Sequence, residues 1–96
     1  MMHGYAKDKA SLVNRLHRIE GQVRGIERML EEDRYCIDVL TQIAAVKTAL
    51  EGVATKVLED HVTHCVAEAL ASGDAAVAGE KSEELLAAVQ RFSRTR

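Results

Sequence analysis

Apolar residues recur between residues 8 and 30 in alternating steps of four and three, the repeat of an amphipathic α-helix with a heptad seam. A polar run, EEDR at 31–34, ends this pattern, and Asp33 within it is a candidate N-cap for the following helix. We therefore predict a first helix over about residues 7–31, preceded by a flexible segment at residues 1–6. The seam consists of Leu12, Leu16, Ile19, Val23, Ile26 and Leu30.

The same alternation continues along a second, longer segment that lacks a stop signal until Ser72 and Gly73. The chain contains no proline, the residue that most strongly interrupts helices. We predict a second helix over about residues 34–71 and a short third helix over about residues 80–92. The fold class is then all-α, a three-helix protomer with a long central helix. The repeating positions of the long segment are Cys36, Leu40, Ile43, Lys47, Leu50, Ala54, Val57 and His61, with Cys65 four residues further.

The composition indicates one small domain, residues 1–96, with a thin core. Hydrophobic residues make up 47% of the chain but aromatic ones only 3%, and a chain of this size buries only roughly 60–65% of its unfolded surface. Association with further copies is therefore expected to complete the core. The chain has neither a run of about 18 apolar residues nor an apolar N-terminal segment, so we expect no membrane span and a cytoplasmic location.

The net charge of −2 conceals an uneven distribution. Residues 1–30 carry six basic and three acidic side chains, whereas the remaining 66 residues carry seven basic and twelve acidic ones. A basic segment on a mildly acidic protein is compatible with anion binding by one face. On this observation alone, an ordinary solvated helix surface is the simpler interpretation.

Three potential metal ligands occupy one face of the predicted second helix. His61 and Cys65 are four residues apart, so their side chains can share a ligand. Cys36 precedes His61 by 25 residues, which returns it to nearly the same face but places it roughly 37 Å away along a straight helix. A second copy packed antiparallel, with its two-fold axis near residues 49–50, would bring Cys36 of one protomer to the other pair. The spacing therefore predicts a homodimer with two intersubunit sites.

Two thiolates and one imidazole form a soft, three-donor set of the kind that selects Cu(I), Zn(II) or an iron–sulfur centre. Structural zinc takes four protein ligands, and only His64 is nearby as a fourth, so three-coordinate Cu(I) is the simplest fit. Two alternatives stay open on the residues alone. The cysteines can be small buried side chains next to exposed histidines, or a Cys–His pair can be a nucleophile, although an orienting third group and a glycine-rich turn are missing.

At these residues the chain resembles the CsoR family of copper-sensing bacterial repressors, which has relatives that respond to nickel or cobalt, formaldehyde and persulfides. The similarity extends from HGYAKDK near the N-terminus to EELL near the C-terminus. It is strongest in RLHRIEGQVRGIERMLEEDRYCIDVLTQIAAVKTALEG and in LEDHVTHC.

The resemblance implies that the Cys-His-Cys set of the copper-sensing branch falls on Cys36, His61 and Cys65. Persulfide sensors carry a cysteine at position 61 and nickel/cobalt sensors a histidine at position 65, and neither change is present here. The resemblance further implies that a tyrosine and a glutamate hydrogen-bond the imidazole nitrogen that is not on the metal, which orients the ring. These two residues fall on Tyr35 and on either Glu83 or Glu84. Some nickel/cobalt relatives use a histidine near the N-terminus, but His3 is expected to belong to a flexible terminus.

Relatives of this family bind operator DNA as a dimer of dimers without a helix-turn-helix, so the same assembly and partner are implied here. Arg15 matches a DNA-contact position of the family, and Lys7 and Arg18 extend the same polar side, with phosphate as the expected target. At position 52, where some members carry an arginine linked to DNA contact, this chain has Gly52.

The expected function is a Cu(I)-responsive repressor that is not an enzyme. Its metal-free oligomer binds operator DNA, and Cu(I) at the intersubunit site releases the DNA and derepresses copper-resistance genes. Two alternatives remain. One is a repressor of the same family with another inducer, namely nickel or cobalt, a persulfide or an aldehyde. The other is a cytosolic copper buffer without a DNA function, which leaves the basic first helix unexplained.

Overall fold

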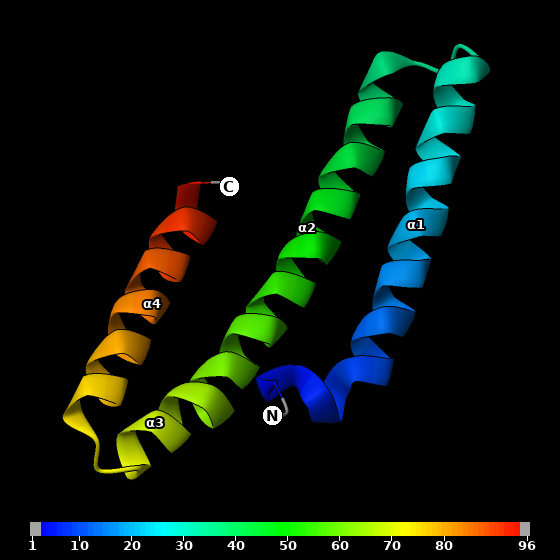
Figure 1. The fold of residues 1–96 in the computed structure, drawn as a ribbon. Helices are drawn as coiled ribbons and strands as arrows, with labels where there is room; N and C mark the ends of the chain where they lie inside the picture. The colour runs from blue at the N-terminus through cyan, green and yellow to red at the C-terminus, as the bar shows by residue number, and fades with distance from the viewer. Residues whose placement is uncertain (1–2, 95–96) are drawn as a thin grey trace. The chain divides into compact units, whose positions relative to one another are not determined.

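The computed structural model describes residues 3–94, and the regular structure of this part of the chain is entirely helical (Figure 1). The all-α, three-helix prediction is confirmed, because α2, η2 and α3 follow one another without a gap between the first and the last long helix. None of the helices in the described part is long and apolar enough to span a membrane. The elements are the 3₁₀ helix η1 (Gly4–Asp8), α1 (Lys9–Glu31), α2 (Cys36–Asp60), the π-helical turn η2 (His61–Val66), α3 (Ala67–Ala71) and α4 (Ala75–Arg94).

The chain divides into two compact units. One is residues 7–56, and the other combines the N-terminal residues up to Ala6 with the chain from Val57 onward. The flexible N-terminal segment predicted at 1–6 is helical from Gly4, whereas residues 1 and 2 lie outside the described part.

In the unit formed by residues 7–56, α1 and α2 lie side by side and run in opposite directions (Figure 1). Only those residues of the predicted α1 seam that are seven apart contribute to the core with α2. Leu12 and Ile19 are buried, and Ile26 is partly buried. The α2 residues in this core are Val46 and Val53, with Ala49 packed against them.

The predicted α2 stripe is not the face that packs against α1. Leu40 is 58% exposed and Leu50 is 45% exposed, and Ile43 between them is also exposed. The buried positions are Val39, one residue before Leu40, and Val46, three residues after Ile43. α2 therefore has two apolar faces, one used within the chain and one left on its surface.

Asp33 ends α1 instead of capping α2. Its backbone is in the left-handed region, with φ of 54°. The N–H of Asp33 donates to the carbonyl of Leu30 (3.2 Å), and the N–H of Arg34 donates to the carbonyl of Met29 (2.9 Å). This pair of bonds is the Schellman motif, which satisfies the last carbonyls of a helix. The N-cap prediction for Asp33 was therefore wrong: a polar residue between two helices suits both roles, and the backbone angle decides between them.

In the other unit, α4 packs against η2 and α3, with Val66 and Ala69 buried. The structure begins the last helix at Ala75, five residues before the predicted start at 80. The cause is Asp74, whose Oδ1 accepts hydrogen bonds from the N–H groups of Ala76 (3.0 Å) and Val77 (3.3 Å). Asp74 is thus the N-cap that the sequence analysis did not identify.

The Asp74→Ala substitution is expected to destabilise the protein by about 1 kcal/mol, because two N–H groups in the first turn of α4 lose their acceptor. Chemical denaturation of the two proteins measures the difference. Asp74→Asn keeps a capping oxygen and should remain within a few tenths of a kcal/mol of the parent. Equal losses in both variants would show that the charge, and not the cap, matters at this position.

Candidate metal centre and DNA-binding surface

His61 and Cys65 lie in the π-helical turn η2. At its end the N–H of Ala67 reaches the carbonyl of Val62, five residues earlier. Such turns are rare, occur mostly as single bulges within α-helices and are frequent at functional sites. The side chains of His61 and Cys65 are half-buried, so two predicted ligands lie together in the least regular turn of the long helical segment.

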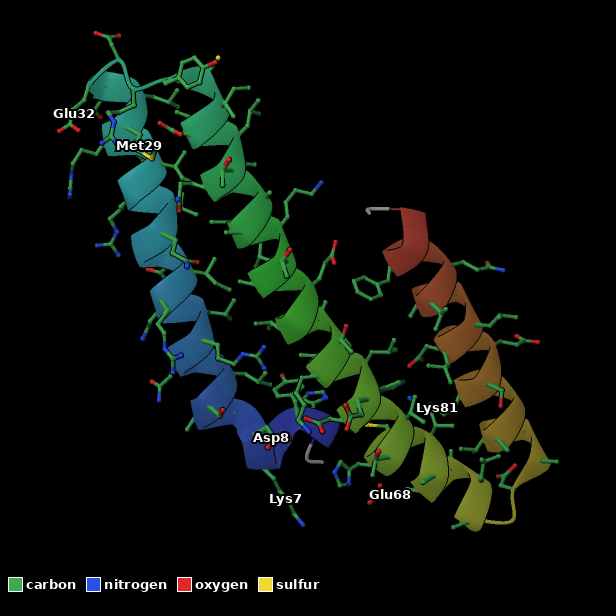
Figure 2. The ribbon with its side chains drawn as sticks, turned by 180° about the vertical axis from the view of Figure 1, so that it is seen from behind. Lys7, Asp8, Met29, Glu32, Glu68 and Lys81 are labelled. Atoms are coloured by element: carbon green, nitrogen blue, oxygen red, sulfur yellow. The ribbon has the colours of Figure 1, made fainter. Side chains whose placement is uncertain are left out.

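The imidazole of His61 contacts a glutamate of α4. Its Nε2 lies 3.5 Å from Oε1 of Glu84, and the same oxygen lies 3.6 Å from Nζ of Lys81. Glu83 has no ion pair or hydrogen bond with any residue in the described part of the chain. Of the two candidate glutamates, the structure therefore brings Glu84 to His61. Lys81, which lies on the side of α4 that faces η2 and α3 (Figure 2), was not identified from the sequence.

The N-terminal segment packs closely against the Cys65 thiol. A Cβ placed on Gly4 would lie 2.6 Å from the carbonyl oxygen of Asp60 and 3.2 Å from Sγ of Cys65. Only glycine fits here without a backbone shift. Its neighbour His3 is exposed, and its ring stacks on Tyr5 with centroids 5.6 Å apart. The histidine expected in a flexible terminus thus has a defined partner, and that partner is an aromatic ring.

Cys36 is the first residue of α2, and Tyr35 immediately precedes it. Cys36 is an exposed free thiol, and Tyr35 is 66% exposed. The 25 residues of α2 separate Cys36 from His61 along the chain. Across residues 3–94 of a single chain, no three His, Cys, Asp or Glu side chains are gathered closely enough to hold a metal ion.

The predicted DNA-contact residues belong to the unit formed by residues 7–56 and differ in their surroundings. Lys7, at the end of η1, and Arg18, on α1, are exposed, and Figure 2 shows the Lys7 side chain extending away from the helices. Arg15 is instead half-buried. None of the three forms an ion pair with a carboxylate among the described residues, whereas Arg24 pairs with Glu20 at 3.4 Å.

The sequence profile of the family described as "Metal-sensitive transcriptional repressor" matches residues 8–91. The chain is 53% identical over 93 residues to the copper-sensing transcriptional repressor RicR of Mycobacterium tuberculosis, covering 97% of this chain and 96% of that protein. It is 51% identical over 94 residues to the copper-sensing repressor CsoR of Bacillus subtilis, covering 97% and 89% of the two chains.

Two solved structures share the fold. The Cu(I)-bound copper-sensing repressor CsoR of Geobacillus thermodenitrificans matches with a TM-score of 0.83 and 42% identity over 97% of this chain and 94% of that one. The nickel-responsive regulator InrS matches with a TM-score of 0.76 and 44% identity over 86% of this chain and 90% of that one. The extent of these similarities, together with the profile match, establishes that the chain belongs to the CsoR family of metal-sensitive transcriptional repressors.

Proposed function

We propose that this protein is a Cu(I)-responsive transcriptional repressor whose metal site forms between two chains. The observation that carries the proposal is the placement of the ligands. His61 and Cys65 lie in one turn, whereas Cys36 is an exposed thiol at the N-terminal end of α2. Within the described residues of one chain, no three potential ligands lie close enough to hold a metal ion. The copper-sensing relatives, at about half sequence identity, support Cu(I) as the inducer.

The second chain is expected to pack on the exposed apolar face of α2. Leu40, Ile43 and Leu50 form this face, and all three are exposed in the isolated chain. They repeat with the period that Cys36 and His61 also follow. An antiparallel partner on this face would therefore cover the apolar side chains and complete two equivalent sites per dimer. Two such dimers would form the DNA-binding tetramer.

The donor set of Cys36, His61 and Cys65 suits Cu(I), which prefers soft thiolates and accepts three ligands. Because Nε2 of His61 faces Glu84, Nδ1 is the ring nitrogen that would be available to hold a metal. A hydrogen bond from Nε2 to a carboxylate orients the ring and raises the basicity of the ligand. Glu84 has this role in our proposal, and Tyr35 of the chain that supplies Cys36 assists it.

DNA binding is assigned to the basic positions Lys7, Arg15 and Arg18. Bound copper can change the affinity for DNA only as far as it binds the two conformations of the protein differently. We place the coupling at His61, because its partner Glu84 belongs to α4 and also contacts Lys81. A movement of the imidazole on metal binding would change that contact and, through it, the packing of α4.

The proposal is tested by anaerobic titration of the reduced protein with Cu(I) while binding to its own upstream DNA is followed by fluorescence anisotropy. We expect binding without metal and release at one Cu(I) per protomer, with affinity falling steeply as salt increases. Absence of DNA binding at any salt concentration would favour a copper buffer. Release by Ni(II) but not by Cu(I), or only by oxidised sulfur species, would assign another inducer to the same fold.

A further inference from the structure

We propose that Gly52 positions the guanidinium of Arg15 for contact with DNA phosphate. Because Gly52 has no side chain, the guanidinium can lie directly against the backbone of α2. The inference rests on the proposed DNA-binding function and assigns Gly52 a role in it. Gly52 is not expected to touch DNA. It acts through Arg15.

The geometry of the contact is specific. A Cβ placed on Gly52 would lie 2.7 Å from Nη2 and 4.0 Å from Cζ of Arg15. The guanidinium thus lies over the α2 backbone, within the space that any other side chain at position 52 would enter. Both residues belong to the unit formed by residues 7–56, whose buried cluster contains Leu12 and Ile19 of α1 and Val53 of α2.

The other glycines within α-helices do not share this environment. A Cβ on Gly21, Gly25 or Gly79 would meet no atom within 4 Å. A glycine inside a helix lowers stability by roughly 0.5–1 kcal/mol relative to alanine. Among the α-helical glycines of the described residues, Gly52 is the one where a side chain of another helix occupies the space that a Cβ would fill, and it carries this cost.

The surroundings of Arg15 suit anion binding. It is the one basic residue of α1 that is half-buried, since Lys9, Arg18, Arg24 and Arg28 are exposed. It forms no ion pair with any described residue, so no carboxylate of that part of the chain neutralises its charge. A guanidinium held against a helix backbone has already lost much of its rotamer freedom, so less entropy is lost when its planar donors meet a phosphate.

The Gly52→Ala substitution tests the inference. The new methyl group would displace the end of the flexible Arg15 side chain without moving the backbone, so the fold is retained and its melting temperature stays equal or rises. The affinity of the metal-free protein for its upstream DNA is expected to fall roughly three- to tenfold, the equivalent of releasing one immobilised side chain. Gly79→Ala, a helical glycine in open space, is the matched control and should leave the affinity unchanged.

A double-mutant cycle with Arg15→Ala separates positioning from a general structural effect. If Gly52 acts through Arg15, Gly52→Ala has no further effect on DNA affinity in the Arg15→Ala background. The inference is overturned if Gly52→Ala lowers DNA affinity equally in both backgrounds, or if Gly52→Ala alone binds DNA as tightly as the wild type. Either result counts against Gly52 even when the wild type binds DNA and Arg15→Ala weakens that binding. A wild type that binds no DNA would instead overturn the proposed function itself.

Discussion

A heterodimer of one Cys36→Ala chain and one Cys65→Ala chain is expected to bind Cu(I), although neither variant binds it tightly alone. In our proposal each site takes Cys36 from one chain and His61 with Cys65 from the other. The heterodimer then retains one complete site, while its second site has lost both thiolates. Each homodimer variant retains only incomplete sites, and loss of a thiolate removes the soft donors that select Cu(I).

The experiment uses chains with two different affinity tags, co-expressed and purified through both. The expected stoichiometry is about one tightly bound Cu(I) per two chains, half that of the wild type. Chelator competition measures the affinity, and a preparation with Cys36→Ala in both tagged chains is the control. Failure of the heterodimer to bind, with the same oligomeric state as the wild type, would exclude a site shared between chains.

Replacing His61 with alanine is expected to separate copper binding from DNA release. We expect the two thiolates still to bind Cu(I), and the proposed DNA-contact residues are untouched, so the metal-free variant should retain its affinity for DNA. The contact between His61 and Glu84 is lost, and with it the proposed connection between the metal and α4. Coupling between two ligands typically amounts to about 5–150-fold in affinity, and in His61→Ala we expect it to fall to about onefold. Parallel DNA titrations with and without Cu(I) measure this ratio.

The adjacent glutamates provide a matched comparison for the same route. Glu84→Ala removes the carboxylate that contacts His61 and should lower the coupling, whereas Glu83→Ala removes an exposed carboxylate of equal charge and should leave it intact. Normal copper-dependent release by His61→Ala, or equal effects of the two glutamate variants, would place the coupling elsewhere in the protein.

Much of the fold was predictable from local sequence features, and the same features supplied the candidate ligands of our proposal. The helical period depends on the spacing of neighbouring apolar residues, and Cys36, His61 and Cys65 are chemically distinctive residues at a spacing that one straight helix cannot close. The ends of the helices were less predictable. Asp33 and Asp74 are the same residue type near helix ends, yet one takes a left-handed backbone angle at the end of α1 and the other caps α4.

The sequence by itself determined an all-α chain with a long central helix, because both follow from the period of its apolar residues, and its spacing predicted a candidate donor set that one straight helix cannot close. Only the tertiary structure decided which apolar face of α2 packs within the chain, since Val46 and Leu50 belong to equally regular repeats and differ only in what covers them. It also selected Glu84 over Glu83 and placed Arg15 on Gly52, because these contacts join residues far apart in the sequence. Their register is set by how the helices pack, which the spacing along one helix does not specify.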